Sequence, residues 1–186
     1  SWNFDALFRC KSDNYTGNWT AWPTSKGDPY STLRTSLRQA GYDPVPFYYD
    51  WRKNVTVIAP ILRSFISTHT PSGETADIVA HSFGGLVSRA YLEKEQSNSR
   101  LDKLLTVGTP HRGMPFAYPL WSGGDLWINN TEFRLGFALM KVACRQTRGL
   151  SSREMVNQMI PSTQNLLPIF DYLQNTAGSL KPVSSM

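Results

Sequence analysis

Long apolar segments are absent from this sequence of 186 residues. No stretch approaches the eighteen or so apolar residues that a membrane-spanning helix needs. The basic residues never form a run of five, which argues against nucleic-acid binding even though the net charge is +5. Weak attraction to an anionic membrane surface stays open. With 40% hydrophobic and 18% charged residues, the composition is that of a globular domain.

Cysteine is also scarce, with only Cys10 and Cys144 present. The two can form one disulfide or remain free thiols, so they do not fix the redox compartment. The sequence has no CxxC pair and no Cys/His cluster, and we expect neither a metal nor a cofactor. N-x-T sequons are a weak hint of glycosylation. They occur at Asn14, Asn18, Asn54 and Asn129. We therefore favour a secreted or membrane-associated protein.

Helical and strand-like patterns alternate up to residue 113. The periodicity predicts helices over 30–40, 57–68 and 86–95 and strands over 45–49, 76–80 and 104–107. This alternation is typical of βα units with a mostly parallel sheet.

The pattern changes in the last third of the chain. Residues 111–130 are predicted to be loop-like. Short helices are predicted over 133–142, 153–158 and 164–174, without strands between them. We therefore predict an α/β core over residues 1–113 and a helical cap or lid over residues 114–186.

The segment Ala80-His81-Ser82-Phe83-Gly84-Gly85 lies between a predicted buried strand and a predicted helix. This context is that of a nucleophile elbow, in which a serine occupies a strained turn and exposes its hydroxyl. Small residues at Ala80 and Gly84 would let neighbouring backbone pass close to the turn. The Phe83 N–H, at the start of the helix, is a candidate oxyanion donor. The alternative is an ordinary turn with an N-cap serine.

Four segments together resemble the α/β-hydrolase superfamily, in its lipase and lecithin:cholesterol acyltransferase-like branch. The first segment runs from Ala80 to Arg89 and contains the elbow. The other three are Val107-Gly108-Thr109-Pro110-His111-Arg112-Gly113, Tyr49-Asp50-Trp51-Arg52, and Pro161 to Pro168. The resemblance implies an α/β-hydrolase fold with a mostly parallel sheet, flanking helices and a helical cap. It also implies Ser82 as the catalytic nucleophile.

The same resemblance exposes what this chain lacks. In this fold the acid and histidine of the triad follow the serine, on strands beyond the cap. Those strands would follow Met186, and the family's first oxyanion segment would precede Ser1, so we expect a fold incomplete at both ends. The chain also starts without Met, which suggests an excised piece. The acid and histidine would then come from another segment or from a companion chain.

Further residues are predicted to shape the site or to bind the substrate. His81, Gly84, Gly85 and His111 are predicted to shape the site, with His111 as a less favoured candidate for the base. Asp50 is interpreted as the ion-pair partner of Arg52. Trp121, Trp127 and Phe133 are candidates for binding an acyl chain, although packing of the cap on the core is the simpler use for each.

The function predicted from the sequence is a serine-dependent acyl-ester hydrolase, lipase- or esterase-like, or a phospholipase or acyltransferase. The expected substrate is a lipid or another acyl ester. The alternative is a catalytically inactive α/β-hydrolase fragment that acts as a structural or partner-binding module.

Overall fold

The computed structural model describes Cys10 and residues 28–174 and 178–182. The elements up to residue 107 are α2 (Ser31–Gln39), α3 (Val55–His69), β1 (Ala76–His81), α4 (Phe83–Glu95), the short 3-10 helix η1 (Gln96–Asn98) and β2 (Leu101–Val107). The later ones are α5 (Ala117–Gly123), α6 (Thr131–Arg148), α7 (Ser152–Met159), the 3-10 helix η2 (Pro161–Leu166), β3 (Asp171–Gln174) and β4 (Leu180–Pro182).

Strands β1 and β2 form a parallel pair joined by α4, with Ala80 opposite Thr106 and His81 opposite Val107. This is the predicted βα unit, since parallel strands need a crossover between them. Helices α3 and α4 pack together on one face of the strand pair, where Ile78 of β1 contacts their buried side chains. The buried residues of this cluster are Ile58, Ala59, Leu62, Ile66, Val87 and Tyr91. The chain therefore has the predicted α/β architecture with flanking helices.

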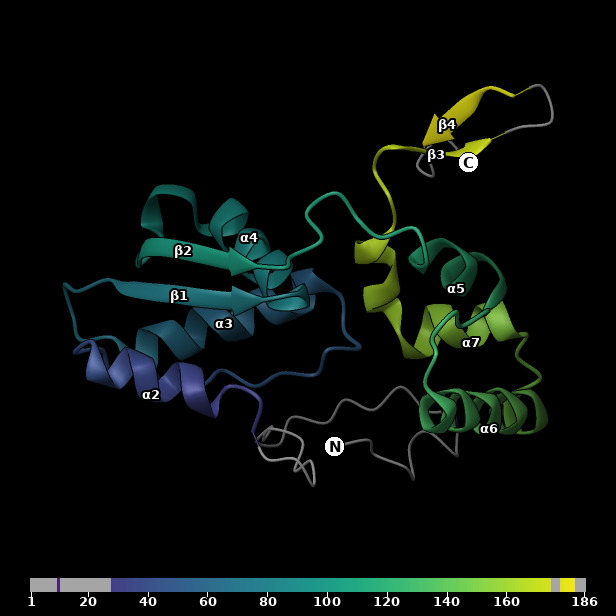
Figure 1. The fold of residues 1–186 in the computed structure, drawn as a ribbon, viewed down its shortest axis with the longest axis horizontal. Coiled ribbons are helices and arrows are strands. Elements are labelled where there is room, and N and C mark those ends of the chain that lie inside the picture. The colour runs from purple at the N-terminus through teal and green to yellow at the C-terminus, as the bar shows by residue number, and fades with distance from the viewer. Residues whose placement is uncertain (1–9, 11–27, 175–177, 183–186) are drawn as a thin grey trace.

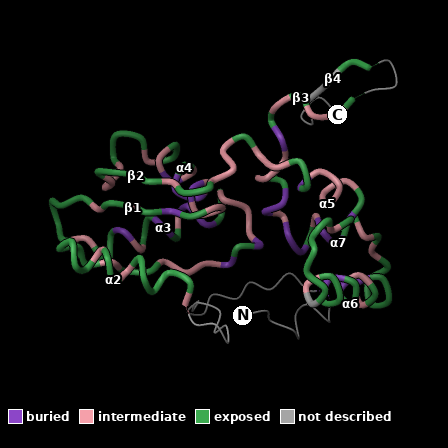
Figure 2. The backbone as a smooth tube through the Cα atoms, viewed as in Figure 1, coloured by how far each residue is buried: buried purple, intermediate pink, exposed green. Residues whose placement is uncertain are grey.

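Helices α5, α6 and α7 form a second group beyond the carboxyl ends of β1 and β2 (Figure 1). Its buried cluster consists of Cys10, Phe137, Met140, Cys144, Met155, Val156, Met159 and Ile160. Cys10 and Cys144 form a disulfide, which is one of the two alternatives that the sequence left open, the other being free thiols. Figure 2 shows the contrast with α2, where no residue is buried.

Residues 45–49 do not form the predicted strand. Pro44 and Pro46 carry no backbone N–H, so this segment cannot supply a regular ladder of hydrogen bonds. It runs instead as an extended connection to α3. The Phe47 ring stacks on Tyr49 with centroids 5.4 Å apart and lies 5.0 Å from the Phe65 ring. The β-rich composition here reflects packing against the core.

Three predictions for the last third were also wrong. Residues 164–174 are not a helix, because η2 ends at Leu166 and Pro168 interrupts helical hydrogen bonding. The chain then enters β3, which pairs antiparallel with β4, so this region does contain strands. The predicted loop over 111–130 contains α5, whose Pro119 lies in the first turn, where its missing N–H has no helical partner to lose.

Candidate active site

Ser82 directly follows β1 and is the N-cap residue of α4, with φ +53° and ψ −125°. A positive φ is unfavourable for a residue with a Cβ, so this conformation must be enforced by its surroundings. The end of β2 holds both backbone groups of Ser82. Its N–H donates to the Val107 carbonyl at 2.9 Å, and its carbonyl accepts from Thr109 Oγ1 at 2.9 Å. The strained turn predicted from the sequence is therefore present.

The side chain of Ser82 is half-buried and does not cap the helix that it begins. Within the described part of the chain its Oγ makes no hydrogen bond. The Phe83 N–H is likewise without an acceptor among those residues, because α4 begins at Phe83. A hydroxyl and a backbone donor thus lie side by side at the N-terminus of a 13-residue helix, where developing negative charge is stabilised.

The two glycines of the elbow differ in how tightly they are packed. A Cβ on Gly84 would lie 3.5 Å from the Tyr49 hydroxyl and 3.8 Å from the Ala80 Cβ, which is ordinary contact. A Cβ on Gly85 would lie only 2.1 Å from Thr109 Oγ1. The structure therefore places the steric need for glycine at Gly85, one residue later than the sequence argument placed it.

Neither histidine near the elbow bonds to Ser82. His81 Nδ1 pairs with the Tyr30 hydroxyl at 2.9 Å. His111 Nδ1 lies 3.4 Å from Arg89 and its Nε2 lies 3.2 Å from Thr106 Oγ1. Because a guanidinium can only donate, Nδ1 accepts and the Nε2–H donates to the threonine. Both ring nitrogens of His111 are thus engaged away from the elbow.

Asp50 and Arg52 form the predicted ion pair. Arg52 Nε donates to Asp50 Oδ1 at 2.8 Å and its terminal nitrogen donates to Oδ2 at 2.7 Å. Both side chains are buried, and the Arg52 carbonyl accepts from the Ser162 N–H at 3.0 Å. Arg52, held by Asp50, therefore links the core to the segment that starts at Pro161, and within the described residues no histidine is bonded to Asp50.

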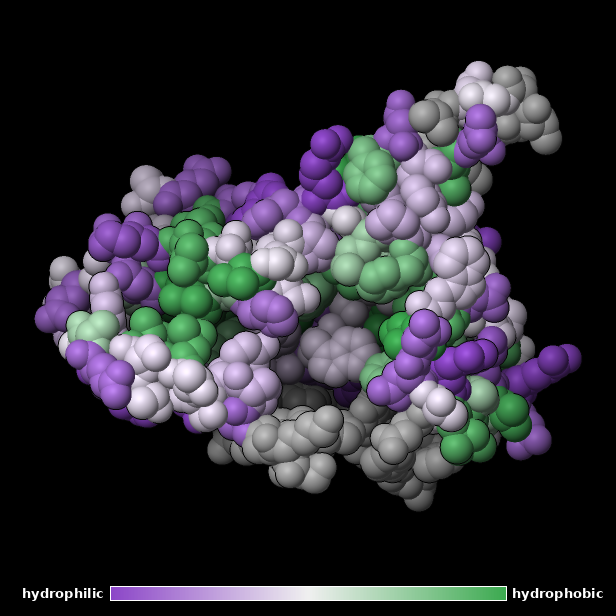
Figure 3. All heavy atoms as spheres, in the orientation of Figure 1, coloured by the Kyte–Doolittle hydropathy of each residue, from purple (hydrophilic) through white to green (hydrophobic). Residues whose placement is uncertain are grey.

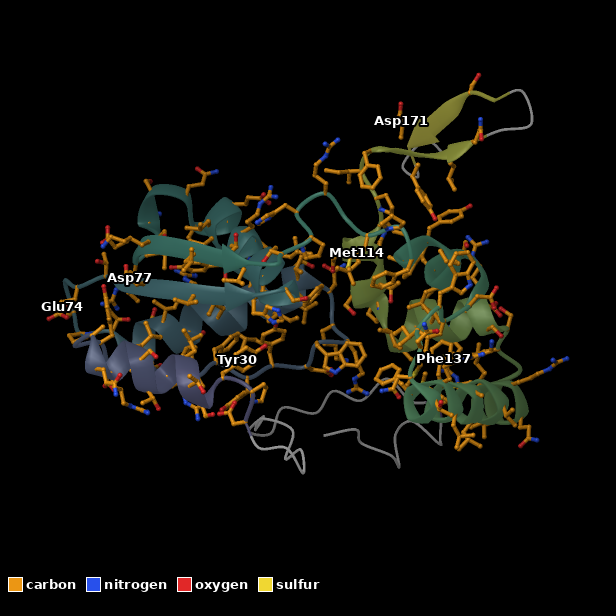
Figure 4. The ribbon with its side chains drawn as sticks, in the orientation of Figure 1. Tyr30, Glu74, Asp77, Met114, Phe137 and Asp171 are labelled. Atoms are coloured by element: carbon orange, nitrogen blue, oxygen red, sulfur yellow. A yellow bond between two sulfur atoms is a disulfide. The ribbon has the colours of Figure 1, made fainter. Side chains whose placement is uncertain are left out.

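The segment after β2 crosses the segment after η2 at close range. The Met114 N–H donates to the Leu166 carbonyl at 2.7 Å, and the Ile169 N–H donates to the Arg112 carbonyl at 3.0 Å. Between them Gly113 has φ +83°, and a Cβ there would lie 2.1 Å from the Leu167 carbonyl oxygen. Figure 4 shows Met114 between the β1–β2 pair and the group formed by α5, α6 and α7. The segment after β2 and the segment after η2 are therefore joined by backbone hydrogen bonds.

The aromatic candidates for acyl binding lie in the helical group, and the hollow beside α6 is lined by Trp127 but not by Trp121 or Phe133. Trp121 packs on the buried cluster of that group, and Phe133 is half-buried at the start of α6. Trp127 is 68% exposed and lines an open hollow of about 290 Å³ with Phe137 and Lys141. Sequence reasoning missed Thr109, Tyr30 and Tyr49, whose roles depend on contacts between distant segments.

Metal and membrane features are absent from the residues that the structure describes. Among them, no three His, Cys, Asp or Glu side chains lie close enough to hold a metal ion. Over the same residues, no helix has the length and apolar character needed to cross a bilayer.

The βα unit and its elbow define the class of this protein as an α/β-hydrolase. Residues 53–174 match the model of the PGAP1-like alpha/beta domain family. The match spans well over half of the chain, and the chain belongs to this family. Membership supports a hydrolase-type function.

The chain was also compared with individual protein sequences and solved structures. No curated protein sequence matches the chain. Among solved structures, the chain is similar to the mature form of the Bacillus licheniformis lipase BlEst2, with 25% sequence identity and a TM-score of 0.32. The match covers 57% of this chain and 45% of the lipase, so the chain spans less than half of that enzyme.

Proposed function

We propose that the chain carries the nucleophile of a serine-dependent acyl-ester hydrolase, and that this nucleophile is Ser82. The observation that carries the proposal is the elbow, where Ser82 is held at φ +53° with its hydroxyl unbonded within the described residues. Strained backbone of this kind is concentrated at active sites, where the strain positions a reacting group. A capping serine would bond to its helix, and Ser82 does not.

In the proposed reaction, Ser82 Oγ bonds to the ester carbonyl carbon as its proton passes to a histidine base. The carbonyl oxygen gains negative charge and accepts from the Phe83 N–H. Collapse of this intermediate breaks the ester bond, and the alcohol leaves with the proton from the base. Water then hydrolyses the acyl-serine. The base and its acid partner come from outside the described residues, in another segment or a companion chain.

The substrate class proposed is an acyl ester of lipid type. A lipase, an esterase, a phospholipase and an acyltransferase would share the acyl-serine step and differ in the group that enters or leaves. Trp121, Trp127 and Phe133 remain proposed contacts for the acyl chain. We also propose the boundary at residues 113 and 114, supported by two separate buried clusters, of which the second draws only Cys10 from the segment before the boundary.

The test is covalent labelling with a fluorophosphonate probe, followed by peptide mass spectrometry. The full-length gene product is compared with Ser82→Ala and with Ser88→Ala, a matched control whose hydroxyl is bonded to the Gly84 carbonyl at 2.9 Å. We expect labelling on Ser82 that survives Ser88→Ala and disappears in Ser82→Ala. Labelling that persists in Ser82→Ala would remove Ser82 from the proposal.

A second function is favoured by the two histidines. Within the described residues, His81 is bonded to Tyr30, and His111 is bonded to Arg89 and Thr106. Neither histidine is therefore placed to activate Ser82. An inactive α/β-hydrolase module that binds a partner would have this arrangement. The labelling experiment separates the two functions, because such a module would leave Ser82 unlabelled even in the full-length gene product.

A further inference from the structure

Helix α6 has two apolar faces. Phe137, Met140 and Cys144 are buried in the helical group, and Figure 4 shows Phe137 pointing inward from α6. The second stripe is formed by Leu135, Leu139 and Val142, whose i, i+4, i+7 spacing places them on the opposite side of the helix. They are 61%, 47% and 54% exposed. Figure 3 shows apolar side chains at the surface over α6.

Basic side chains accompany this exposed stripe. Arg134, Lys141 and Arg145 lie along one flank of α6, between the two apolar faces. Arg134 and Arg145 are exposed and have no acidic partner among the residues described. Trp127 lies beside Arg134, Ala138 and Lys141 at the same flank. The exposed face of α6 is thus an apolar stripe edged by cations and one tryptophan.

We propose that this face of α6 binds the surface of an anionic lipid bilayer. Charge complementarity selects the partner, because Arg134 and Arg145 have no acidic partner among the described residues and anionic lipid attracts each basic residue near the surface. An amphipathic helix with aliphatic residues on one side, flanking Arg and Lys and a nearby Trp binds in the plane of such an interface. The three-residue stripe is too small for a stable dimer, which needs roughly 800 Å² on each partner.

The inference is independent of catalysis, and its test uses the Ser82→Ala chain so that ester hydrolysis plays no part. Binding is measured by co-sedimentation with vesicles of phosphatidylcholine alone and of phosphatidylcholine with phosphatidylglycerol. We expect binding to the anionic vesicles that weakens in high salt. The double variant Leu135→Gln/Leu139→Gln should bind about tenfold more weakly. Arg134→Gln/Arg145→Gln should lose a similar factor on anionic vesicles.

The matched control is Val57→Gln/Ile61→Gln on α3, which removes two side chains that are each 53% exposed at the same i, i+4 spacing. This control should bind as the parent does, and thermal melts should show all variants folded. The inference is overturned if the parent does not bind, or if it binds neutral and anionic vesicles equally. It is also overturned if the α6 variants bind undiminished, or if they convert a dimeric parent to a monomer.

Discussion

Gly85 and Gly84 offer the sharpest comparison between neighbouring residues. Gly85→Ala would place a Cβ 2.1 Å from Thr109 Oγ1. This clash is relieved only if α4 or the segment after β2 moves. We expect a loss of about 2 kcal/mol in the free energy of unfolding. Gly84→Ala meets only ordinary contacts and gains helix propensity, so it should be neutral or stabilising by up to about 1 kcal/mol. Urea denaturation measures both, and equal effects would contradict the packing described here.

Thr109 connects β2 to the strained serine. Thr109→Val removes the hydroxyl that donates to the Ser82 carbonyl but keeps the side-chain volume beside Gly85. Loss of one such bond costs about 1 kcal/mol. In the full-length gene product, we expect this variant to lower the rate of fluorophosphonate labelling at Ser82 by about fivefold. Thr109→Ser, which retains the hydroxyl, should restore the rate. Equal labelling of Thr109→Val and the parent would show that the bond does not position Ser82.

The buried hydroxyl of Tyr49 should make the free energy of unfolding depend on pH at high pH. Burial of its ring, with a smaller contribution from Tyr30, raises the pKa of Tyr49 from 10.0 to about 12. Between these values the unfolded chain loses the proton and the folded chain keeps it, so stability falls as the pH rises from 10 to 12. The contribution is complete below pH 10. Tyr49→Phe should remove up to about 2 kcal/mol of this decline, measured by urea denaturation at pH 9 and pH 11.5.

Helix α7 begins with a capping box in which Ser151 and Glu154 satisfy each other's backbone N–H groups. The same helix buries Met155, Val156 and Met159, so its start is coupled to the core of the helical group. Ser151→Ala should lower the free energy of unfolding by about 1 kcal/mol.

The control for this helix is Thr147→Ala on α6, where an exposed hydroxyl only bonds back to the Ala143 carbonyl. Its effect should stay within about 0.5 kcal/mol. Thermal denaturation followed by circular dichroism compares the two variants. If Thr147→Ala proved as costly as Ser151→Ala, the capping box would not be what stabilises the start of α7.

The whole chain should have almost no esterase activity by itself. Without a histidine bonded to Ser82 among the described residues, the hydroxyl has no base to accept its proton. Removing the serine or histidine of a comparable protease triad lowers turnover about a million-fold. We expect the 186-residue chain and its Ser82→Ala variant to hydrolyse p-nitrophenyl butyrate at the same background rate. Hydrolysis that depends on Ser82 would contradict this, and His111→Ala would then be the next variant.

The sequence by itself determined the parts of this protein that depend on local pattern. The βα unit follows from the apolar runs at 76–80 and 104–107 and the helical stripe between them. The turn at Ser82 follows from the small residues around it. Local pattern failed at 45–49, where Pro44 and Pro46 adjoin the β-rich residues, and at 164–174, where Pro168 ends the helical stretch and the chain turns into β3.

Only the tertiary structure decided how distant segments meet. Thr109 reaches the Ser82 carbonyl, and Gly113 passes the backbone at Leu167. The disulfide between Cys10 and Cys144 joins residues 134 positions apart. No periodicity within a single helix or strand encodes such pairs, because their partners are set by how whole elements pack. The ionisation of Tyr49 and the packing limit at Gly85 follow from that packing.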